Sequence, residues 1–286
     1  MRSFKRAAYW LLPPGIQDWI RNSMQPTNSA HVSPEEKRTL EQNARFMDRH
    51  RGERCFVLAT GPSIRHHDLK LLEGETCFAV SNFFVHADYR RIAPRYYCVV
   101  GRHPPITEEN WSQWLRELQN GLGAATLFMS LGDRPTVERH GLFRDREVHY
   151  LDLRGDREKA VTGTMDLAAR LPAPQSVTVM ALEIAIFMGF REIFLLGCDH
   201  DWVTHLGESR HFYEEKDNAL VRGGYNEWSN DMGNLEMQFS QLAALWKQYK
   251  LFRSFAERED CRIWNATQGG LLDVFPKVEY NSLFKK

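Results

Sequence analysis

Short apolar runs alternate with amphipathic stretches along most of the chain, and this alternation predicts strands and helices in turn. The runs that predict strands cover residues 55–59, 77–80, 96–100, 125–129, 147–153, 192–197 and 261–264. The stretches that predict helices cover residues 33–50, a segment that starts at Ser63, and residues 111–118, 177–190 and 235–257. Strands that alternate with helices build a parallel sheet covered on both faces. The sequence therefore predicts an α/β fold with a doubly wound, mostly parallel, Rossmann-like sheet.

The same pattern divides the chain into three regions. Residues 1–24 form a basic, aromatic N-terminal arm, residues 25–53 contain the N-terminal helix, and residues 54–286 form the Rossmann-like domain. Within that domain, residues 203–233 are polar and rich in glycine and aromatic residues. This stretch is long for a connection between a strand and a helix, so we expect a lid or binding insertion there.

Composition excludes several classes of protein. The 37 lysines and arginines equal the 37 aspartates and glutamates, so no net charge attracts the whole molecule to nucleic acid. The five cysteines lie singly within or beside apolar runs, without the paired spacing of a metal knuckle. Such cysteines are typical of small core residues in a reducing compartment. We expect a soluble cytoplasmic protein that has no nucleic-acid partner.

The N-terminal arm is the one locally basic part of the sequence. It carries two tryptophans, one tyrosine, a single acid, Asp18, and the four cations Arg2, Lys5, Arg6 and Arg21. Its apolar centre, AAYWLL, ends at two prolines and is too short for a signal peptide or for a spanning helix of roughly 20 residues. We expect the arm to bind the inner face of the cytoplasmic membrane through its aromatic and cationic side chains. The alternative is a helix that packs on the domain or on a partner subunit.

Polar or glycine-rich residues follow five of the expected strands. Ligands of doubly wound sheets bind beyond the carboxyl ends of the strands, so these positions are the candidate site. They are residues 60–63, 81–82, 101–103, 199–201 and 265–270.

The first of these strand ends reads Thr60-Gly61-Pro62-Ser63. Gly61 lets the backbone approach a ligand closely, Pro62 fixes the chain, and Ser63 starts a helix whose free amides favour phosphate. The sequence contains no Walker lysine and no G-x-G-x-x-G, which excludes a P-loop and a standard dinucleotide site.

The run Asp199-His200-Asp201 allows two interpretations. Asp-x-Asp after an apolar strand is typical of sites that hold Mg²⁺ against a diphosphate, with Asp199 and Asp201 as ligands. The alternative is a site without metal. A zinc site built from Asp199, His200, His205 and His211 is disfavoured, because the spacings fit no common pattern.

His211 lies in the expected lid, within SRHFYEEK. An imidazole titrates near neutral pH and can accept a proton from a hydroxyl, and Glu214 or Glu215 could orient it. The alternative is that His211 and Tyr213 only pack the lid.

The Gly-Pro-Ser turn, the strand that ends in Ser-Asn-Phe-Phe, and SVTVMALEIAIFMGFREIFLLGCDHDW together resemble the bacterial family-42 sialyltransferases. The sequence is similar also to the hydroxymethylpterin diphosphokinase-like group, which includes flagellin-modifying motility accessory factors. The closing IWNATQGGLLDVFP resembles this second group. The resemblance covers residues 54–276.

The resemblance implies a pocket for a CMP-sugar donor and no requirement for a metal. It implies that Gly61, Pro62, Ser63 and Asn82 line the nucleotide pocket, and that Ser176 and Thr178 meet the donor's phosphate or carboxylate. Thr60 departs from the family, which usually has asparagine there. It also implies a histidine base in the lid, for which His211 is the candidate. We name Asp199 as a second catalytic candidate. We add the last strand end to the nucleotide contacts: Asn265, Gly269 and Gly270.

Three functional hypotheses follow. The first is a glycosyltransferase that moves an acidic sugar, of the sialic, legionaminic or Kdo type, from a CMP donor to a cell-surface glycan or glycolipid. The second is a pterin diphosphokinase-like enzyme that uses ATP and Mg²⁺. The third is a nucleotide- or sugar-binding protein without catalysis.

Overall fold

The computed structural model describes residues 32–103, 106–157, 165–205, 210–213 and 234–285. Residues 34–286 belong to one compact unit. The expected arm, most of the expected lid, and Glu214 and Glu215 lie outside the described residues.

The centre of the unit is a sheet of eight strands, and every pair of neighbours is parallel. Its order is β6-β5-β4-β3-β2-β1-β7-β8. The chain runs outward from β1 to β6 and then returns to the other side of β1, which makes the gap between β1 and β7 the topological switch point. The strands are β1 Arg54–Leu58, β2 Cys77–Val80, β3 Tyr96–Val99, β4 Thr126–Ser130, β5 Val148–Gly155, β6 Arg170–Pro172, β7 Glu192–Leu196 and β8 Arg262–Asn265.

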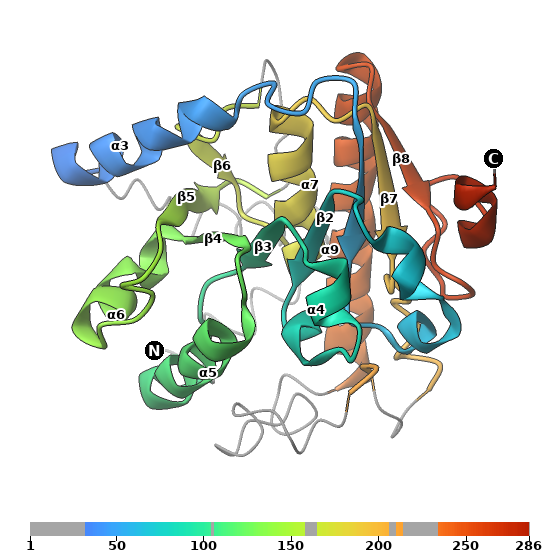
Figure 1. Cartoon of the computed structure of the whole chain (residues 1–286), viewed down its shortest axis with the longest axis horizontal. Helices are drawn as coiled ribbons and strands as arrows, with labels where there is room; N and C mark the ends of the chain where they lie inside the picture. The colour runs from blue at the N-terminus through green and yellow to red at the C-terminus, as the bar shows by residue number, and fades with distance from the viewer. Residues whose placement is uncertain (1–31, 104–105, 158–164, 206–209, 214–233, 286) are drawn as a thin grey trace, which may run out of the picture. The chain divides into compact units, whose positions relative to one another are not determined.

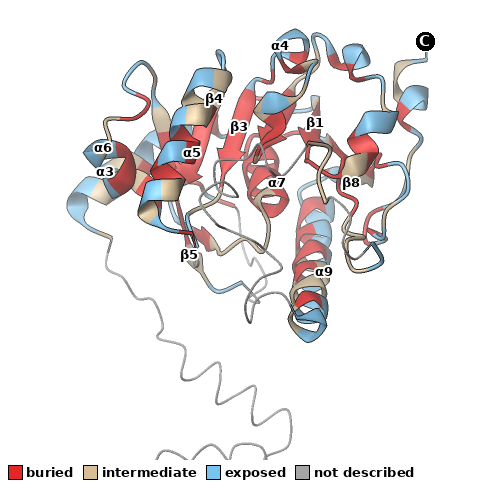
Figure 2. Cartoon of the chain, turned by 90° about the horizontal axis from the view of Figure 1, so that it is seen from below, coloured by how far each residue is buried: buried red, intermediate tan, exposed pale blue. Residues whose placement is uncertain are grey.

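Helices cover both faces of this sheet, so the predicted doubly wound α/β fold is confirmed (Figure 1). Figure 2 shows α4 on one side of the sheet and α7 and α9 on the other. The helices are α3 Pro34–Glu41, α4 Tyr89–Ile92, α5 Glu108–Gly121, α6 Arg134–Arg139, α7 Val177–Phe187 and α9 Leu235–Arg258.

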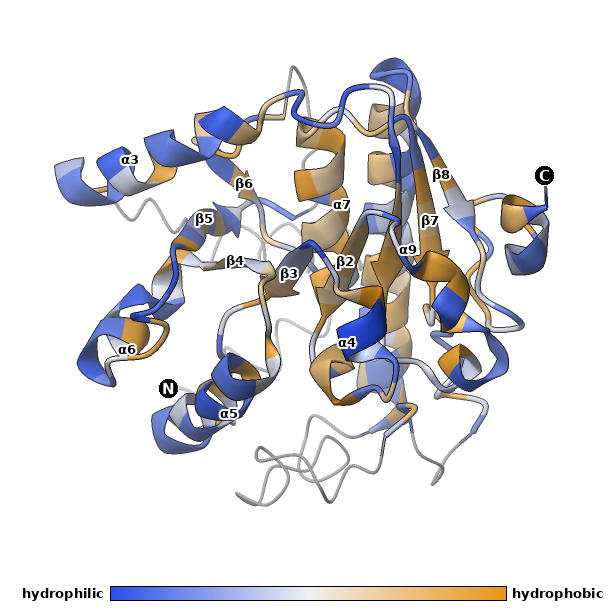
Figure 3. Cartoon of the chain, in the orientation of Figure 1, coloured by the Kyte–Doolittle hydropathy of each residue, from blue (hydrophilic) through white to orange (hydrophobic). Residues whose placement is uncertain are grey.

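Helix α7 forms the middle of the core, as its apolar sequence predicts. Every residue from Thr178 to Phe187 is buried, including Glu183. Figure 3 shows the contrast between the apolar α7 and the hydrophilic outer surfaces of α3 and α5. The five cysteines are free and buried, as expected. None of the helices in the described ranges is long and apolar enough to cross a membrane.

Two expected elements differ from the structure. The segment after Gly61 is not an α-helix: it forms two 3-10 turns, Pro62–His66 and Leu69–Leu72, interrupted by the extended His67. Side-chain bonds explain the interruption, because the Asp68 carboxylate accepts the Lys70 N–H and starts the second turn separately. Strand β6 is absent from the strands that the sequence predicts, because three residues are too few to show a period.

The N-terminal helix also ends earlier than expected. Helix α3 stops at Glu41 and continues as a 3-10 turn only to Phe46.

Candidate functional site

A cavity of about 300 Å³ lies at the carboxyl ends of β1, β2 and β7, beside the switch point of the sheet. Its wall comes from six separate parts of the chain: the ends of these three strands, the start of α7, the described residues of the expected lid, and one face of α9. The residues are Ala59, Thr60, Gly61, Val80, Ser81, Gln175, Ser176, Val177, Thr178, Gly197, Asp199, His200, Asp201, Trp202, Arg210, His211, Gln238, Gln241 and Leu245.

Nine of the residues singled out in the sequence meet in this cavity. They come from positions far apart in the chain, and only the parallel order of the strands brings them together. They are Thr60, Gly61, Ser81, Ser176, Thr178, Asp199, His200, Asp201 and His211.

Ser63 does not line the cavity; it holds Asp199. Its backbone N–H donates to Asp199 Oδ1 at 3.1 Å and its hydroxyl donates to Asp199 Oδ2 at 2.8 Å. The close backbone approach at Gly61 serves the same contact, since a methyl group there would overlap the Asp199 carboxylate and lie 2.5 Å from the Gly197 carbonyl oxygen. The Gly-Pro-Ser turn, including Pro62, therefore binds an internal anion, where the sequence suggested a bound phosphate.

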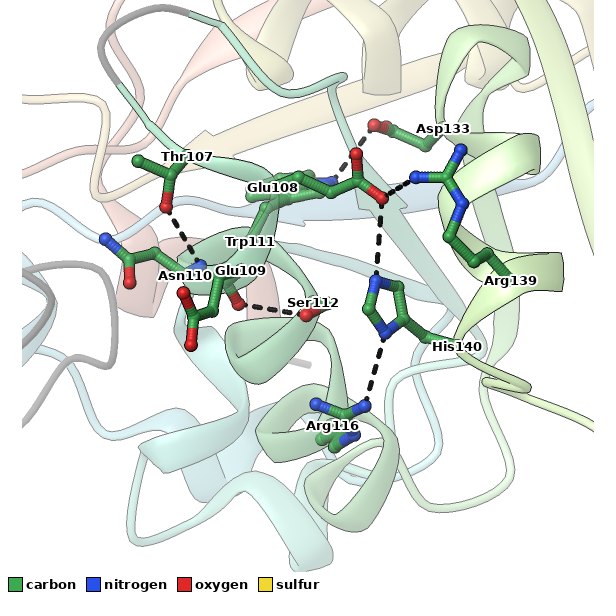
Figure 4. Close-up of polar contacts among 10 residues, drawn as sticks. All are labelled: Thr107, Glu108, Glu109, Asn110, Trp111, Ser112, Arg116, Asp133, Arg139 and His140. Carbon is green, nitrogen blue, oxygen red and sulfur yellow. Dashed lines mark hydrogen bonds and ion pairs between the residues drawn. The ribbon is translucent and has the colours of Figure 1, made fainter.

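Asn82 also points away from the cavity wall, which its neighbour Ser81 occupies. Asn82 is buried and its Oδ1 accepts a hydrogen bond from Trp114 Nε1 at 2.5 Å. Trp114 stacks on Trp111. The Nε1 of Trp111 donates to Asp133 Oδ1 at 3.0 Å (Figure 4). Asn82 thus belongs to the cluster that anchors α5 to the sheet.

The last strand end forms a closed loop outside the cavity. The side chain of Asn265 donates to Leu272 O at 2.8 Å and accepts from Thr267 N at 3.0 Å. Gly270 has φ +68° and packs on the Asp199 backbone, where a side chain would lie 2.7 Å from the carbonyl oxygen. Neither Asn265, Gly269 nor Gly270 lines the cavity, so we leave them out of the site.

Asp199 is a poor metal ligand in this arrangement. Both of its carboxylate oxygens already accept hydrogen bonds from Ser63, and only 7% of the residue is exposed. Burial raises the pKa of Asp199, against those two bonds, which lower it. Among the described residues, no group of three or more His, Cys, Asp or Glu side chains is placed to hold a metal ion. The residues do not fit Mg²⁺, and we derive no step through it.

The short segment that carries His211 is held against the end of β1. The His211 Nδ1 lies 3.0 Å from Thr60 Oγ1, and the next residue, Phe212, donates its N–H to Thr60 O at 2.9 Å. Arg65 donates two hydrogen bonds to Phe212 O, at 2.9 and 2.6 Å. His211 stacks on Tyr213 with ring centroids 4.8 Å apart. These contacts fix the imidazole at the cavity wall.

The N-terminus of α7 faces the same cavity. Ser176 precedes the helix, and the hydroxyl of Ser176 caps no backbone N–H of the helix. This hydroxyl oxygen is buried, and it lies beside the Tyr249 hydroxyl, whose pKa it lowers against the larger effect of burial. The first N–H groups of an α-helix have no partner within the helix and carry its positive dipole. The start of α7 therefore offers an anion site.

Sequence reasoning missed Gln175, which precedes α7, and the three residues that α9 contributes to the wall, Gln238, Gln241 and Leu245. It marked the strand ends at Ser81 and His200 but not their left-handed backbone conformations, with φ +51° and +50°, which non-glycine residues rarely adopt. Burial lowers the pKa of His200 to about 4, so its ring is neutral, with Nε2 2.9 Å from Tyr249 Oη. Strained backbone of this kind often lies in binding sites. No local sequence signal marks it.

Helix α9 holds two parts of the wall in place. Gln248 is 1% exposed, accepts from Gln175 N at 2.7 Å and donates to Ala173 O at 3.0 Å. Near the start of α9, Gln238 accepts from Trp202 Nε1 at 2.9 Å. The loop before α7 and the loop after β7 are thus both bonded to one helix.

Comparison with known proteins bears on the fold. No family model and no curated protein matches this sequence. The structure is similar to that of the sialyltransferase CstII from Campylobacter jejuni, which was solved with the substrate analogue CMP-3FNeuAc. The TM-score is 0.52 and the sequence identity is 16%. The match covers 82% of this chain and 89% of that chain. The structure is similar also to the MAf glycosyltransferase from Magnetospirillum magneticum AMB-1, with a TM-score of 0.50 and 16% identity over 87% of this chain.

The chain spans only 38% of the length of that MAf protein. At 16% identity, both similarities show a shared fold. As a similarity of fold, they confirm the resemblance that the sequence motifs indicate.

Proposed function

We propose that this protein is a glycosyltransferase that moves an acidic sugar from a CMP-activated donor to a hydroxyl of a cell-surface glycan or glycolipid. One observation carries the proposal: His211, Thr60 and the start of α7 meet in a single cavity at the switch point of the sheet. The fold is similar to that of a sialyltransferase solved with a CMP-sugar analogue, which supports this choice of donor.

His211 acts as the general base in this proposal. When its Nδ1–H donates to Thr60 Oγ1, Nε2 is the atom that takes the proton from the acceptor hydroxyl. The acceptor oxygen then bonds to the anomeric carbon of the donor sugar, and the bond from that carbon to the phosphate oxygen breaks.

The start of α7 stabilises the departing CMP. The free N–H groups of its first turn and the Ser176 hydroxyl donate to the phosphate, whose charge increases as the glycosidic bond breaks. Asp199 acts indirectly, because it holds the Gly61 turn in place through Ser63.

A thermal-shift screen of cytidine, uridine, guanosine and adenosine nucleotides, with and without Mg²⁺, tests the donor class. We expect CMP at saturating concentration to raise the melting temperature by about 5 °C without Mg²⁺, since a ligand at about 100 times its Kd adds about 2.7 kcal/mol. Stabilisation only by ATP with Mg²⁺ would contradict the proposal and favour the diphosphokinase hypothesis. CMP binding without transfer from any donor would favour a binding protein.

His211→Ala tests the base. We expect kcat for transfer to fall by about 100-fold or more, while the affinity for CMP changes by less than about threefold. His140→Ala is the matched control, because His140 lies outside the cavity, near Glu108 and Arg116 (Figure 4). Wild-type kcat in His211→Ala would remove His211 from the mechanism.

A further inference from the structure

Tyr249 joins two parts of the cavity wall without lining the cavity itself. It is 0% exposed, and its hydroxyl oxygen lies 2.9 Å from His200 Nε2. Burial raises the pKa of this hydroxyl, and the hydroxyls of Ser176 and Thr178, which lie beside it, act in the opposite direction. All three neighbours line the cavity. Tyr249 therefore connects the loop after β7 with the start of α7.

The hydroxyl proton of Tyr249 can serve only one of these neighbours. A phenol has one O–H donor and two lone pairs, so with three neighbours it donates one hydrogen bond and accepts two. Burial lowers the pKa of His200 to about 4, so its ring is neutral near neutral pH and carries a proton on one nitrogen only. The nitrogen that carries this proton sets the direction of the other bonds.

Each tautomer of His200 gives the start of α7 a different character. When the proton is on Nδ1, Nε2 accepts from Tyr249, and the Ser176 hydroxyl can only donate to Tyr249, so its lone pairs face the cavity. When the proton is on Nε2, Tyr249 accepts from His200 and donates to a hydroxyl at the start of α7, whose own proton then faces the cavity. The first wall repels a phosphate, and the second binds it.

Ser176 is the hydroxyl that suits the second arrangement. A serine before a helix usually accepts a hydrogen bond from an N–H of the first turn, but Ser176 accepts none. Its oxygen is buried and has no other partner among the described residues, whereas Thr178 Oγ1 also contacts Cys198 Sγ at 4.0 Å. The Ser176 oxygen is therefore available to accept from Tyr249. Its proton then points into the cavity at the positive end of the α7 dipole.

We propose that His200 and Tyr249 are positioning residues, which turn the Ser176 hydroxyl so that it donates to the phosphate of the CMP donor. The bonds run in one direction, from His200 Nε2–H to Tyr249 Oη, from Tyr249 Oη–H to Ser176 Oγ, and from Ser176 Oγ–H to the phosphate. No proton is transferred along this chain. Hydrogen bonds in a chain polarise one another, so the chain strengthens the last bond as charge collects on the departing phosphate. This inference rests on the proposed function.

Titration calorimetry with CMP and with cytidine tests the chain on wild type, Tyr249→Phe, Ser176→Ala and the double variant. We expect each single variant to weaken CMP binding by about 10-fold and to leave cytidine binding within about threefold, because only CMP carries the phosphate. The double variant should also lose about 10-fold rather than about 100-fold, since both substitutions break the same chain. Tyr89→Phe is the matched control, because it removes another buried hydroxyl, which donates to Leu122 O at 2.9 Å outside the cavity. It should not change the affinity for CMP.

The tautomer of His200 is measured separately, on the wild-type protein. In isotope-labelled protein, the nitrogen chemical shifts of the His200 ring show which nitrogen carries the proton. A proton on Nε2 supports the proposal, whereas a proton on Nδ1 contradicts it and leaves the proposed function intact. This measurement needs no variant, so it decides the question even if Tyr249→Phe does not fold.

The outcomes separate the two proposals. If wild type binds neither CMP nor CMP-3FNeuAc, the proposed function is wrong, and this inference is wrong with it. If wild type binds CMP and the double variant loses about 100-fold, Tyr249 and Ser176 act independently, and only this inference is wrong. Equal losses of CMP and cytidine in Tyr249→Phe would show that the variant disturbs the whole pocket, which would also contradict this inference alone.

Discussion

Asp199 and Asp133 are buried carboxyl groups that perform the same task at two places on the sheet. Asp199 follows β7 and accepts the N–H of Ser63, which follows the neighbouring strand β1. Asp133 follows β4 and accepts the N–H of Arg102, which follows the neighbouring strand β3, at 3.2 Å. In both places a carboxylate joins the loops that leave two adjacent strands, which keeps the carboxyl edge of the sheet rigid.

Asp133 makes this arrangement sensitive to pH. Its Oδ1 accepts from Arg102 N and Trp111 Nε1, but its Oδ2 is buried without a partner. Burial raises the pKa of Asp133 from 3.8 to about 6, against these two hydrogen bonds. Because the folded-state pKa is raised, the contribution of this group to stability is complete below about pH 4 and is lost as the pH rises through 6.

We therefore expect Asp133→Asn to be more stable than wild type at pH 8 by about 1 to 3 kcal/mol, since asparagine keeps the acceptor and removes the buried charge. The advantage should disappear near pH 4. Urea unfolding of both proteins at the two pH values measures it. An advantage of equal size at both pH values would show that the charge is not its cause.

Thr60 occupies the position where the resemblance implies asparagine, and the structure gives it a partner. Its hydroxyl contacts His211 Nδ1 at 3.0 Å. We expect Thr60→Val to lower kcat for transfer by about 10-fold, because the imidazole loses the bond that sets its tautomer, with little change in the affinity for CMP. Thr60→Ser keeps the hydroxyl and is the control. A fall in CMP affinity with unchanged kcat would instead make Thr60 a nucleotide contact.

At the scale of elements, α9 connects the parts of the site. Gln248 bonds the loop before α7, Gln238 bonds Trp202 after β7, and Tyr249 contacts His200. These residues are spaced so that they share one face of the helix. The pocket is thus supported by a single rigid element, although its residues come from several loops.

Gln248→Leu tests this support. The variant leaves the partly buried N–H of Gln175 without its partner, whereas the carbonyl of Ala173 keeps its bond from Arg157 Nε, so we expect a loss of about 1 to 3 kcal/mol in the free energy of unfolding. Lys247→Leu, at the adjacent exposed position of α9, is the control and should change stability by less than about 0.5 kcal/mol. Denaturant unfolding measures both variants. Equal stability of the two would show that the loop before α7 does not depend on α9.

The position of the Gly-Pro-Ser turn can be predicted from the sequence, but the group that the turn binds cannot. Its position at the end of β1 is evident from the apolar run before it. The group that the turn binds is the carboxylate of Asp199, which lies 136 residues away from Ser63 in the sequence. No local pattern reports such a contact.

At the scale of the whole molecule, residues 34–286 form one compact unit. We expect deletion of residues 1–24 to leave the melting temperature unchanged within about 2 °C. The deletion should weaken binding to anionic vesicles by about 100-fold, because each cation near such a surface contributes about 1 kcal/mol. Co-sedimentation with anionic and with neutral vesicles measures this. A change in molecular mass on deletion, without a change in vesicle binding, would indicate that the arm contacts a partner subunit.

The sequence by itself determined the strands β1–β5, β7 and β8, the buried helix α7, and the edge of the sheet that carries the polar strand ends. These features depend on local periodicity and on the regular alternation of strands and helices, both of which are visible in short windows. Only the tertiary structure decided which strand ends form the cavity. It brought Thr60, Ser176 and His211 together and turned Asn82 and Asn265 toward internal partners. The physical reason is that strand order and side-chain pairing are set by contacts between residues distant in the chain, and a buried polar group bonds to whichever partner the fold places beside it.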